Sequence, residues 1–239
     1  VWEGKTYGAL TNPHEALPPY AIAHKQIGHV DEKQFVPFAF WRSVDASSHC
    51  FFVESFIDEL AHAAGADPLA YRLGLLDGAA RDVVAAARDM SGWQTGVDEN
   101  GRAYGVALTY CFGSYVAQVA SVSIEDGRPR VHDVWCAVDC GRMINPNSVV
   151  AQIQGGVIYG LSAALYGRID IKDGAVVQSN FHDYPVVKMT EAPRVHVQVL
   201  QRDTPPQGVG EVGTPPIAPA VANAMAVLGD RRRRLPLIG

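Results

Sequence analysis

A long uncharged run constrains the fold of this chain most strongly: residues 145–167 contain no Asp, Glu, Lys or Arg. A run of that length could cross a membrane. It also holds several glycines and four amide side chains, which lower its hydrophobicity; the amides are Asn145, Asn147, Gln152 and Gln154. We therefore interpret the run as a buried helix of a soluble protein, over about residues 148–166, and expect no transmembrane segment.

The composition is suited to a body large enough to cover such a helix. Of the 239 residues, 48% are hydrophobic and 19% are charged, which excludes intrinsic disorder and an isolated coiled coil. The net charge of −5 does not favour nucleic acid or an anionic membrane as a partner. Four scattered cysteines are too few for a disulfide scaffold, and Cys136 and Cys140 lack the second pair typical of a metal site. We assign no residue as a metal ligand.

Residues 1–95 are predicted to form an extended N-terminal arm followed by a helical lobe. Residues 1–40 contain several prolines and no helical period, which predicts extended segments that wrap around another body. Apolar residues at helical spacing follow. The predicted helices are residues 48–64, 69–76 and 79–90. Because residue 1 is Val rather than Met, we expect the chain to begin at a processed or cut end. The sequence does not distinguish between the bacterial cytoplasm and the periplasm as the location of the protein.

Residues 96–239 are predicted to form a mixed α/β lobe. The predicted strands are residues 104–110, 115–124, 131–138 and 194–200, and the turn at 125–127 joins the second and third as a hairpin. A second hairpin pairs residues 168–171 with 175–178. An apolar helix over 217–228 follows the Gly- and Pro-rich loop 204–216. The expected fold class is α+β, a helical lobe beside a mixed sheet that carries two buried apolar helices.

The loop 208–213 has the sequence GVGEVG and so fits the dinucleotide pattern G-x-G-x-x-G. That pattern requires a strand running directly into the glycines and a helix beginning among them. Here prolines at 205–206 and 215–216 separate the loop from both elements, which disfavours a nicotinamide or flavin site. The alternative is a platform for Glu211, a carboxylate placed before an apolar helix and therefore a candidate general base. A solvated loop glutamate is the simpler interpretation.

A second group of polar residues begins the uncharged helix. Asn145 suits an N-cap and Pro146 a first helical turn. Gln152 must find a hydrogen-bond partner if it is buried, so it serves either the core or a ligand. Two weaker patterns are expected to be structural: Glu59-x-x-His62, which is half of a di-iron motif, and the pair at 182–183.

Several segments, in the same order along the chain, resemble segments of a known protein family. They are FWRSV at 40–44, ESFIDELAH at 54–62, ADP at 66–68, VDCG at 138–141, NP at 145–146, AQIQGG at 151–156, QSNFHDYP at 178–185 and GVGE at 208–211. Over about residues 37–236 the chain resembles the C-terminal part of the molybdenum-binding large subunit of the xanthine oxidase and aldehyde oxidase family. The isoquinoline 1-oxidoreductase branch, with its aldehyde-dehydrogenase relatives, is the most similar.

The resemblance implies a chemistry and a set of site residues. It implies a molybdopterin cofactor, in bacteria often the cytosine dinucleotide form, and oxidation of an aldehyde or an N-heteroaromatic ring. Glu211 matches the base that removes a proton from the molybdenum-bound hydroxyl group, and Arg42 matches an active-site arginine. Gln152 matches a glutamine beside the metal. The matching segments also place cofactor-binding residues in this chain, namely Trp41, Gly208, Val209 and Gly210.

Two departures from the family bear on the partners. The xanthine oxidase type has Arg-Gly-Phe-Gly where residues 42–45 read RSVD. A full large subunit is also several times longer and carries further glycine-rich loops that hold the pterin. We therefore expect a half-site that is inactive alone, completed by the remaining half of the molybdenum subunit and served by an iron–sulfur electron-transfer subunit. The alternative is a non-catalytic remnant or assembly subunit of the same fold without cofactor.

Overall fold

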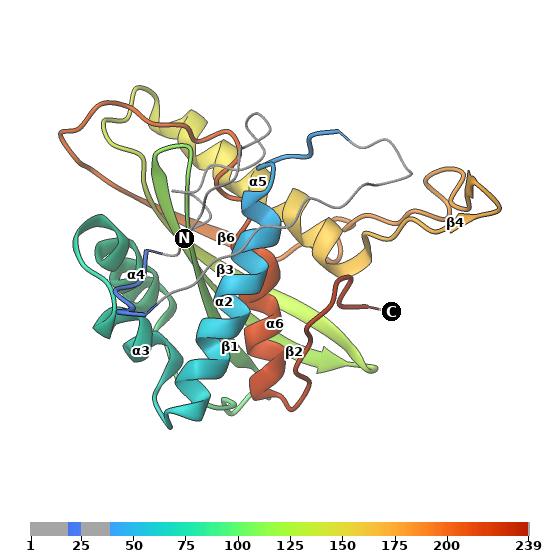
Figure 1. Ribbon diagram of the computed structural model, residues 1–239, viewed down its shortest axis with the longest axis horizontal. Helices are drawn as coiled ribbons and strands as arrows, with labels where there is room; N and C mark the ends of the chain where they lie inside the picture. The colour runs from blue at the N-terminus through green and yellow to red at the C-terminus, as the bar shows by residue number, and fades with distance from the viewer. Residues whose placement is uncertain (1–18, 25–38, 239) are drawn as a thin grey trace.

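The computed structural model describes residues 19–24 and 39–238, so most of the expected N-terminal arm, and residue 37 where the resemblance begins, lie outside the described residues. In the described part, helices pack on both faces of a four-stranded mixed sheet (Figure 1). The expected combination of helices with a mixed sheet is confirmed. Each predicted helix is present, with ends that differ from the expected ones by no more than two residues.

The main sheet contains two antiparallel hairpins and one parallel pair. Its strand order is β1 (Ala103–Cys111), β2 (Ser114–Glu125), β3 (Arg128–Asp139) and β6 (Arg194–Leu200). The predicted hairpin between β2 and β3 is confirmed, with Glu125 opposite Arg128. Between them Asp126 and Gly127 have φ values of 49° and 74°. Two consecutive positive φ values are typical of the tight hairpin turn that Asp-Gly favours.

Strand β6 lies beside β3 and runs parallel to it, with Asp133 opposite Arg194 and Asp139 opposite Leu200. Parallel neighbours need a long crossover, and residues 140–193 supply it. The carboxyl ends of both strands therefore lie at one edge of the sheet. The loops that leave this edge are joined there, because the N–H of Arg142 donates to the carbonyl of Thr204 at 2.9 Å.

Helices cover the two faces of the sheet according to the alternation of its side chains. On β2, Val116 and Ala120 face α5 (Pro146–Tyr166) and α6 (Ile217–Val227), whereas Ala117 and Val119 face the opposite side. On that opposite side α3 (Pro68–Gly74) and α4 (Gly78–Ser91) pack.

Helix α2 (Ala46–Ala63) lies beside α6 and the edge strand β1. Gly105 of β1 allows α6 to approach closely, since a Cβ there would overlap the carbonyl of Ala220.

The uncharged run forms α5, and its N-terminus is built as expected. The Asn145 side chain accepts a hydrogen bond from the N–H of Ser148 at 3.2 Å, and Pro146 occupies the first turn. By length and mean hydropathy, 1.3, α5 could cross a membrane. One of its faces is nevertheless buried in the main core through Ile153, Val157 and other residues. Packing in the core accounts for the absence of charge on that face.

A buried ion pair joins the N-terminal helices. Arg72 of α3 is fully buried and donates from Nε to Oε2 of Glu54 on α2 at 2.9 Å. Tyr20 donates from its hydroxyl to Oε1 of the same carboxylate at 2.6 Å. The short described segment at 19–24 is thereby fastened to α2 and α3.

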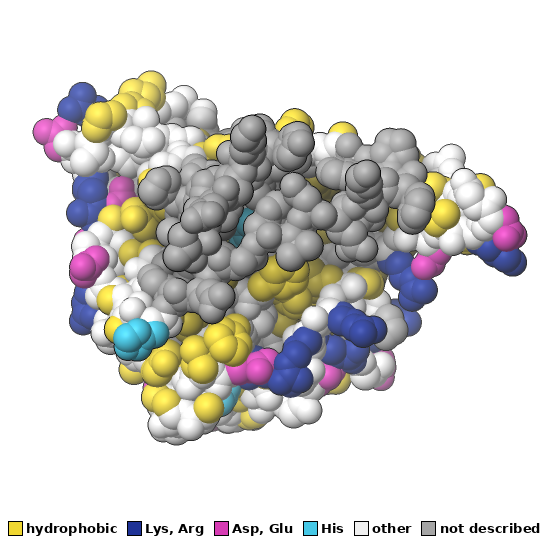
Figure 2. Space-filling view, in the orientation of Figure 1, with side chains coloured by type: hydrophobic (Ala, Val, Ile, Leu, Met, Phe, Trp, Pro, Cys, Tyr) yellow, Lys and Arg dark blue, Asp and Glu magenta, His cyan; other side chains and the backbone are white. Residues whose placement is uncertain are grey.

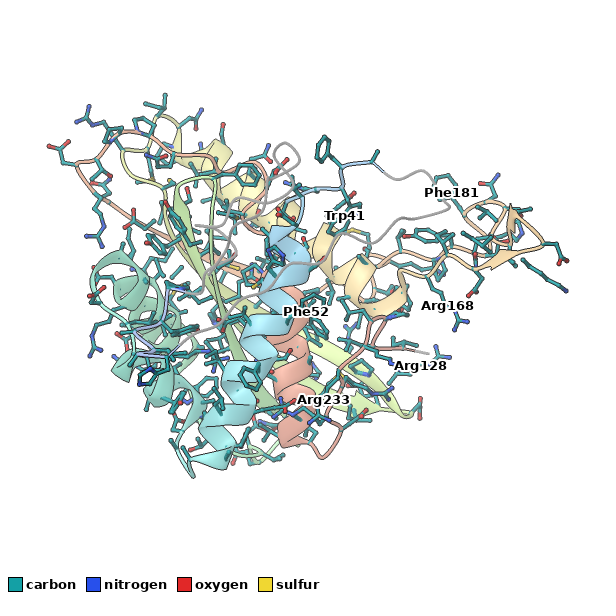
Figure 3. All side chains as sticks on the ribbon, viewed as in Figure 1. Trp41, Phe52, Arg128, Arg168, Phe181 and Arg233 are labelled. Atoms are coloured by element: carbon teal, nitrogen blue, oxygen red, sulfur yellow. The ribbon has the colours of Figure 1, made fainter. Side chains whose placement is uncertain are left out.

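Residues 168–189 project from the body (Figure 1). We call this segment the arm; it is distinct from the N-terminal arm expected from the sequence. Its hairpin is present but shorter than predicted, with β4 (Ile171–Lys172) paired to β5 (Ala175–Val176). Large apolar side chains on the arm are exposed, and Phe181 is 84% exposed near its outer part (Figure 3). An isolated two-stranded hairpin is only marginally stable. The hydrogen bond from Gln178 Nε2 to Asp170 at 3.1 Å helps to hold its shape.

The connection from α4 to β1 passes residue 95, where we predicted the division between two lobes. Helix α4 packs directly on β2 and β3, so the two sections share a hydrophobic core. The division at residue 95 remains a prediction.

Candidate functional site

Arg42 brings together three segments that are far apart in the sequence. Its Nε and Nη2 atoms donate to the carbonyl of Gly210 at 2.9 and 2.5 Å. Nη2 also donates to Oε1 of Gln152 at 3.1 Å. The predicted site residues on the segment before α2, on α5 and in the loop 208–213 therefore lie together. The Nε and Nη2 atoms of Arg42 are therefore already bonded to other groups of this chain.

Two aromatic rings extend this cluster. Trp41 stacks on Tyr159 of α5, with ring centroids 5.0 Å apart. The guanidinium carbon of Arg42 lies 5.6 Å from the centre of the Tyr159 ring, within the range of a cation–π contact. Tyr159 was not among the predicted site residues. It lies seven positions after Gln152, which places both on the same face of a helix, so helical spacing could have indicated it.

Glu211 is half-buried, and one of its carboxylate oxygens is isolated. Oε2 is removed from solvent and has no hydrogen-bond partner among the described residues. The position of the loop is set by its backbone: the N–H of Thr214 donates to the carbonyl of Glu211 at 3.0 Å, and the buried Gln118 donates to the carbonyl of Gly213 at 2.8 Å. A buried acceptor without a partner costs free energy. Among the described residues, the contacts that hold Glu211 in this position are those of the loop backbone.

Glycines let α5 lie directly against the loop that carries Glu211. A Cβ on Gly156 would come within 3.1 Å of the Gly213 backbone, and a Cβ on Gly160 within 2.6 Å of the Thr214 carbonyl. Any larger residue would separate the helix from the loop. The glycines of α5 therefore determine how near Gln152 comes to the loop.

The glycine loop does not have the arrangement of a dinucleotide site. It begins several residues after β6 ends at Leu200, and α6 begins only at Ile217. The N–H of Gly208 donates to the carbonyl of Phe112 at 3.0 Å, and the Gly208 carbonyl accepts from Ser114 at 2.7 Å. The Gly208 backbone is therefore bonded to the β1–β2 turn, and the loop lacks the strand–glycine–helix arrangement that the dinucleotide pattern requires.

The weaker patterns have structural partners. Glu59 accepts from Arg233 at 2.8 Å, and His62 lies 3.3 Å from Asp58. Asp183 accepts from two backbone N–H groups of the arm at 2.9 Å. The described residues contain no group of three or more His, Cys, Asp and Glu side chains able to hold a metal ion. Burial raises the pKa of the Cys140 thiol, which keeps it protonated.

Comparisons with known proteins identify relatives. Residues 45–193 match the family described as molybdopterin cofactor-binding domain. The beta chain of isoquinoline 1-oxidoreductase from Brevundimonas diminuta is 35% identical, over 99% of this chain and 32% of that protein. One component of the nicotinate dehydrogenase of Pseudomonas putida is 34% identical, over 93% of this chain and 20% of that protein. Aldehyde oxidoreductase from Desulfovibrio gigas shares the fold, with a TM-score of 0.70, 14% identity, and coverage of 83% of this chain and 40% of that chain.

The chain spans about a third or less of the length of these two curated relatives. The likeness to the Desulfovibrio gigas enzyme, at 14% identity, concerns the fold. The family match covers more than half of the chain, and the curated relatives align along nearly all of it. This protein belongs to the molybdopterin cofactor-binding domain family, whose relatives here are oxidoreductases of the xanthine oxidase type.

Proposed function

We propose that this chain supplies the proton-accepting side of the active site of a molybdenum hydroxylase, which oxidises an aldehyde or hydroxylates an N-heteroaromatic ring. One observation carries the proposal: Oε2 of Glu211 is buried and has no partner in the described part of the chain, and the preceding residue, Gly210, is bonded to Arg42, which also bonds to Gln152. An unpaired, buried carboxylate oxygen lowers the free energy of unfolding, so a loop glutamate with only a structural role would not benefit from one. Such an oxygen is useful in a group that must accept a proton from a bound reactant.

The exposed polar groups of the cluster fit a large polar cofactor. Gln152 and Gly210 are exposed, and Nε2 of Gln152 has no acceptor among the described residues. In our proposal Gln152 and the backbone of Gly208, Val209 and Gly210 hold molybdopterin, in the cytosine dinucleotide or the simpler form. When bound, the cofactor supplies the two-electron oxidant and the water-derived oxygen. Trp41 borders the cofactor from the segment before α2.

Within this chain, each group has a distinct task. Glu211 accepts a proton at its half-buried carboxylate, whose inner oxygen, Oε2, bonds to no other described group. Arg42 acts as a positioning residue, because its guanidinium donors are directed at Gly210 and Gln152. The catalytic role that the resemblance implies for Arg42 stays a prediction, and the positioning role is our proposal from these contacts. Positioning of this kind matters because a small displacement of a reacting group can greatly lower the rate.

The rest of the enzyme is proposed to come from outside this chain. The chain spans 32% and 20% of the two curated relatives, so the remaining, larger part of the molybdenum subunit would complete the cofactor site. Exposed aromatic side chains at Phe52 and Phe56 of α2, 63% and 59% exposed, are consistent with a surface that another part covers. Figure 2 shows hydrophobic side chains gathered on this face beside arginines, and Figure 3 places Phe52 above Arg233. Electrons would leave through an iron–sulfur subunit.

The test is Glu211→Gln in the complete assembled enzyme. Glutamine keeps the size of the side chain but cannot accept the proton, so kcat/KM falls by about 10²–10⁴-fold. Molybdenum content and folding stay unchanged. Glu99→Gln is the matched control, since it makes the same chemical change at an exposed position and leaves the rate as it was. A Glu211→Gln enzyme with normal metal and more than about a tenth of the wild-type rate would show that Glu211 is structural.

Metal analysis separates this proposal from its alternative. A non-catalytic remnant or assembly subunit of the same fold would contain no molybdenum when purified with its neighbours. Stoichiometric molybdenum supports the hydroxylase. The retention of both Glu211 and Gln152 favours the catalytic form, because a remnant needs neither of them.

A further inference from the structure

Buried oxygen atoms without a partner are concentrated at the turn that carries Glu211. Among the described residues, five buried side-chain oxygens have no hydrogen-bond partner, and three of them belong to Glu211, Thr214 and Gln118. Thr214 closes the turn, because its N–H donates to the carbonyl of Glu211 at 3.0 Å. Gln118 of β2 reaches the same turn and donates from Nε2 to the carbonyl of Gly213 at 2.8 Å. We call Glu211, Thr214 and Gln118 the buried polar cluster.

Close packing separates the inner side of this turn from solvent. Gln118 and Val212 are fully buried, and Thr214 is 2% exposed. Helix α5 lies directly against the turn, since a Cβ on Gly213 would come within 2.9 Å of the carbonyl of Ile153. A polar atom without a partner in such surroundings costs free energy, and native proteins rarely keep one. Three of them on one turn call for a partner that they share.

The chemistry of the three oxygens defines that partner. Nε2 of Gln118 must face the Gly213 carbonyl, because an amide oxygen in its place would face another oxygen, so Oε1 remains as an acceptor. Oε2 of Glu211 is an acceptor while the carboxylate is ionised, and the Thr214 hydroxyl can donate or accept. A water molecule is complementary to this set, because it can donate to both acceptors and accept from the hydroxyl.

We propose that one internal water bridges Glu211, Thr214 and Gln118, and that Thr214 and Gln118 are positioning residues for the proposed base. The inference rests on the proposed function for the role of Glu211, whereas the water site itself does not depend on it. Buried waters typically make about three hydrogen bonds to groups that otherwise lack partners. The buried polar cluster offers that number of groups.

A bound water suits a group that gains and loses a proton. A backbone N–H directed at Oε2 would favour the ionised carboxylate alone. A water donates to Oε2 when Glu211 is ionised, and it turns to accept from Oε2 when Glu211 is protonated there. In the second state the water donates to Oε1 of Gln118 and to the oxygen of Thr214, so each of the three oxygens keeps one bond. The Glu211 side chain therefore keeps its position in both protonation states.

The first test is a crystal structure of the assembled enzyme at a resolution that shows ordered water. We expect one water within about 3.2 Å of Oε2 of Glu211, Oε1 of Gln118 and Oγ1 of Thr214. An ordered turn without this water, or one in which the three oxygens bond to another part of the enzyme, overturns the inference.

Two substitutions at Thr214 separate the role of its hydroxyl from that of its methyl group. Thr214→Val keeps the shape of the side chain but removes the hydroxyl, so kcat falls about tenfold, the equivalent of one hydrogen bond, while KM is unchanged. Thr214→Ser keeps the hydroxyl, so kcat stays close to that of the wild type. A packing role predicts the reverse order, because the methyl carbon Cγ2 of Thr214 lies towards α5, 3.2 Å from where a Cβ on Gly160 would be. The reverse order, or wild-type kcat in Thr214→Val, overturns the inference.

Thr95→Val is the matched control, since it makes the same change at an exposed position between α4 and β1 and leaves kcat as it was. The crystal structure of the wild type decides the water site even if a Thr214 variant does not fold. Failure of the proposed function has a different signature: the water is present, while the enzyme contains no molybdenum or Glu211→Gln retains full activity.

Discussion

The contact between α5 and the loop of Glu211 can be tested with one pair of substitutions in the same helix. Gly160→Ala and Gly155→Ala add the same methyl group five positions apart. At Gly160 the new Cβ would lie 2.6 Å from the Thr214 carbonyl and 2.8 Å from the Ile217 side chain, whereas at Gly155 nothing lies within 4 Å. The loop must move by about 0.8 Å to restore the 3.4 Å of ordinary contact. Gly155→Ala is therefore the control for helix propensity.

The expected free energies of unfolding differ in size and in sign. Alanine gains up to about 1 kcal/mol over glycine within a helix, and both variants receive this gain. Overpacking at Gly160 costs about 1–3 kcal/mol. Gly155→Ala thus stabilises the protein by up to about 1 kcal/mol, and Gly160→Ala lies about 1–3 kcal/mol below it. Urea unfolding of the two variants measures this difference directly.

The same displacement should also lower activity. Thr214 donates its N–H to the carbonyl of Glu211, so a shift at Thr214 reaches the proposed base. A misplacement of about 1 Å can cost about 100-fold in rate, and we expect kcat/KM of assembled Gly160→Ala enzyme to fall towards that limit. If Gly160→Ala proved as stable as Gly155→Ala and fully active, the loop would be free to move, and the close packing of α5 would not position Glu211.

Three further outcomes are expected. Gln152→Ala should lower kcat/KM less than Glu211→Gln at equal molybdenum content, because an orienting amide takes no proton; the reverse order would exchange their roles. Arg72→Met should cost about 3–5 kcal/mol in urea unfolding, since it leaves the Glu54 carboxylate buried and unpaired, and a loss below about 1 kcal/mol would contradict this. Backbone N–H groups of the arm hold the pKa of Asp183 in the folded protein below its usual 3.8. The ionised Asp183 carboxylate therefore stabilises the folded protein above pH 3.8, and this contribution is lost as the pH falls through the lower pKa of the folded state. An NMR titration that returned 3.8 or higher would contradict the Asp183 contacts.

Local features of this protein followed from the sequence because their causes are local. The apolar spacing before Gly65, the Asn145-Pro146 start of α5 and the Asp126-Gly127 turn each depend on residues within one or two turns of chain. The hairpin of the arm was recognised for the same reason, and only its length was overestimated. Its strands lack a neighbouring sheet that would extend their pairing.

The composition of the candidate site was also indicated by sequence, through the ordered resemblance that singled out Arg42, Gln152 and Glu211. The roles that the resemblance implies for them stay predictions, and their contacts could not be derived from the sequence. A matched motif states that an arginine is present, but the atoms to which its guanidinium group donates depend on carbonyl positions in other segments. Arg42 meets Gln152 across 110 positions and Gly210 across 168. Those contacts are the basis on which we propose a positioning role for Arg42, and its catalytic role stays a prediction.

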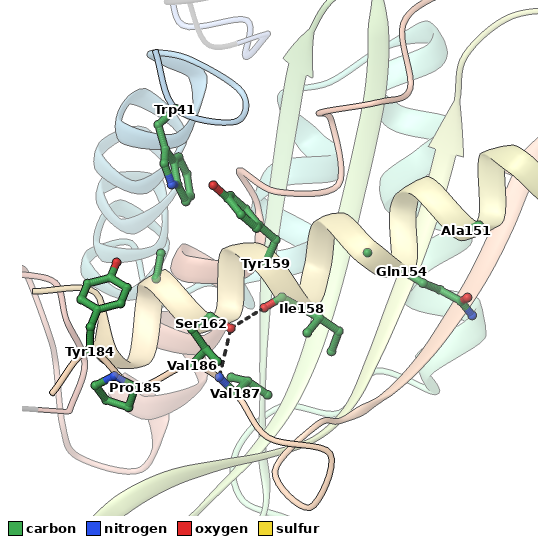
Figure 4. A pocket seen from close by; sticks show the side chains of 12 residues that line it. Trp41, Ala151, Gln154, Ile158, Tyr159, Ser162, Tyr184, Pro185, Val186 and Val187 are labelled. Atoms are coloured by element: carbon green, nitrogen blue, oxygen red, sulfur yellow. Dashed lines mark hydrogen bonds between the residues drawn. The ribbon is translucent and has the colours of Figure 1, made fainter. Parts of the chain in front are cut away.

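By itself, the sequence determined the type and approximate bounds of the helices and strands, the presence of an uncharged helix at α5 and the family, whereas the structure buries only one face of that helix. Tertiary structure alone decided that β6 joins β3 in parallel and that Gly156 and Gly160 bring α5 against the Glu211 loop. It also decided that one Glu211 oxygen is buried with no partner among residues 19–24 and 39–238. It also placed residues 184–187, where the chain returns from the arm, along the outer face of α5 (Figure 4). The physical reason is that periodicity and turn chemistry act over a few residues, whereas pairing, close approach and desolvation depend on which distant surfaces meet.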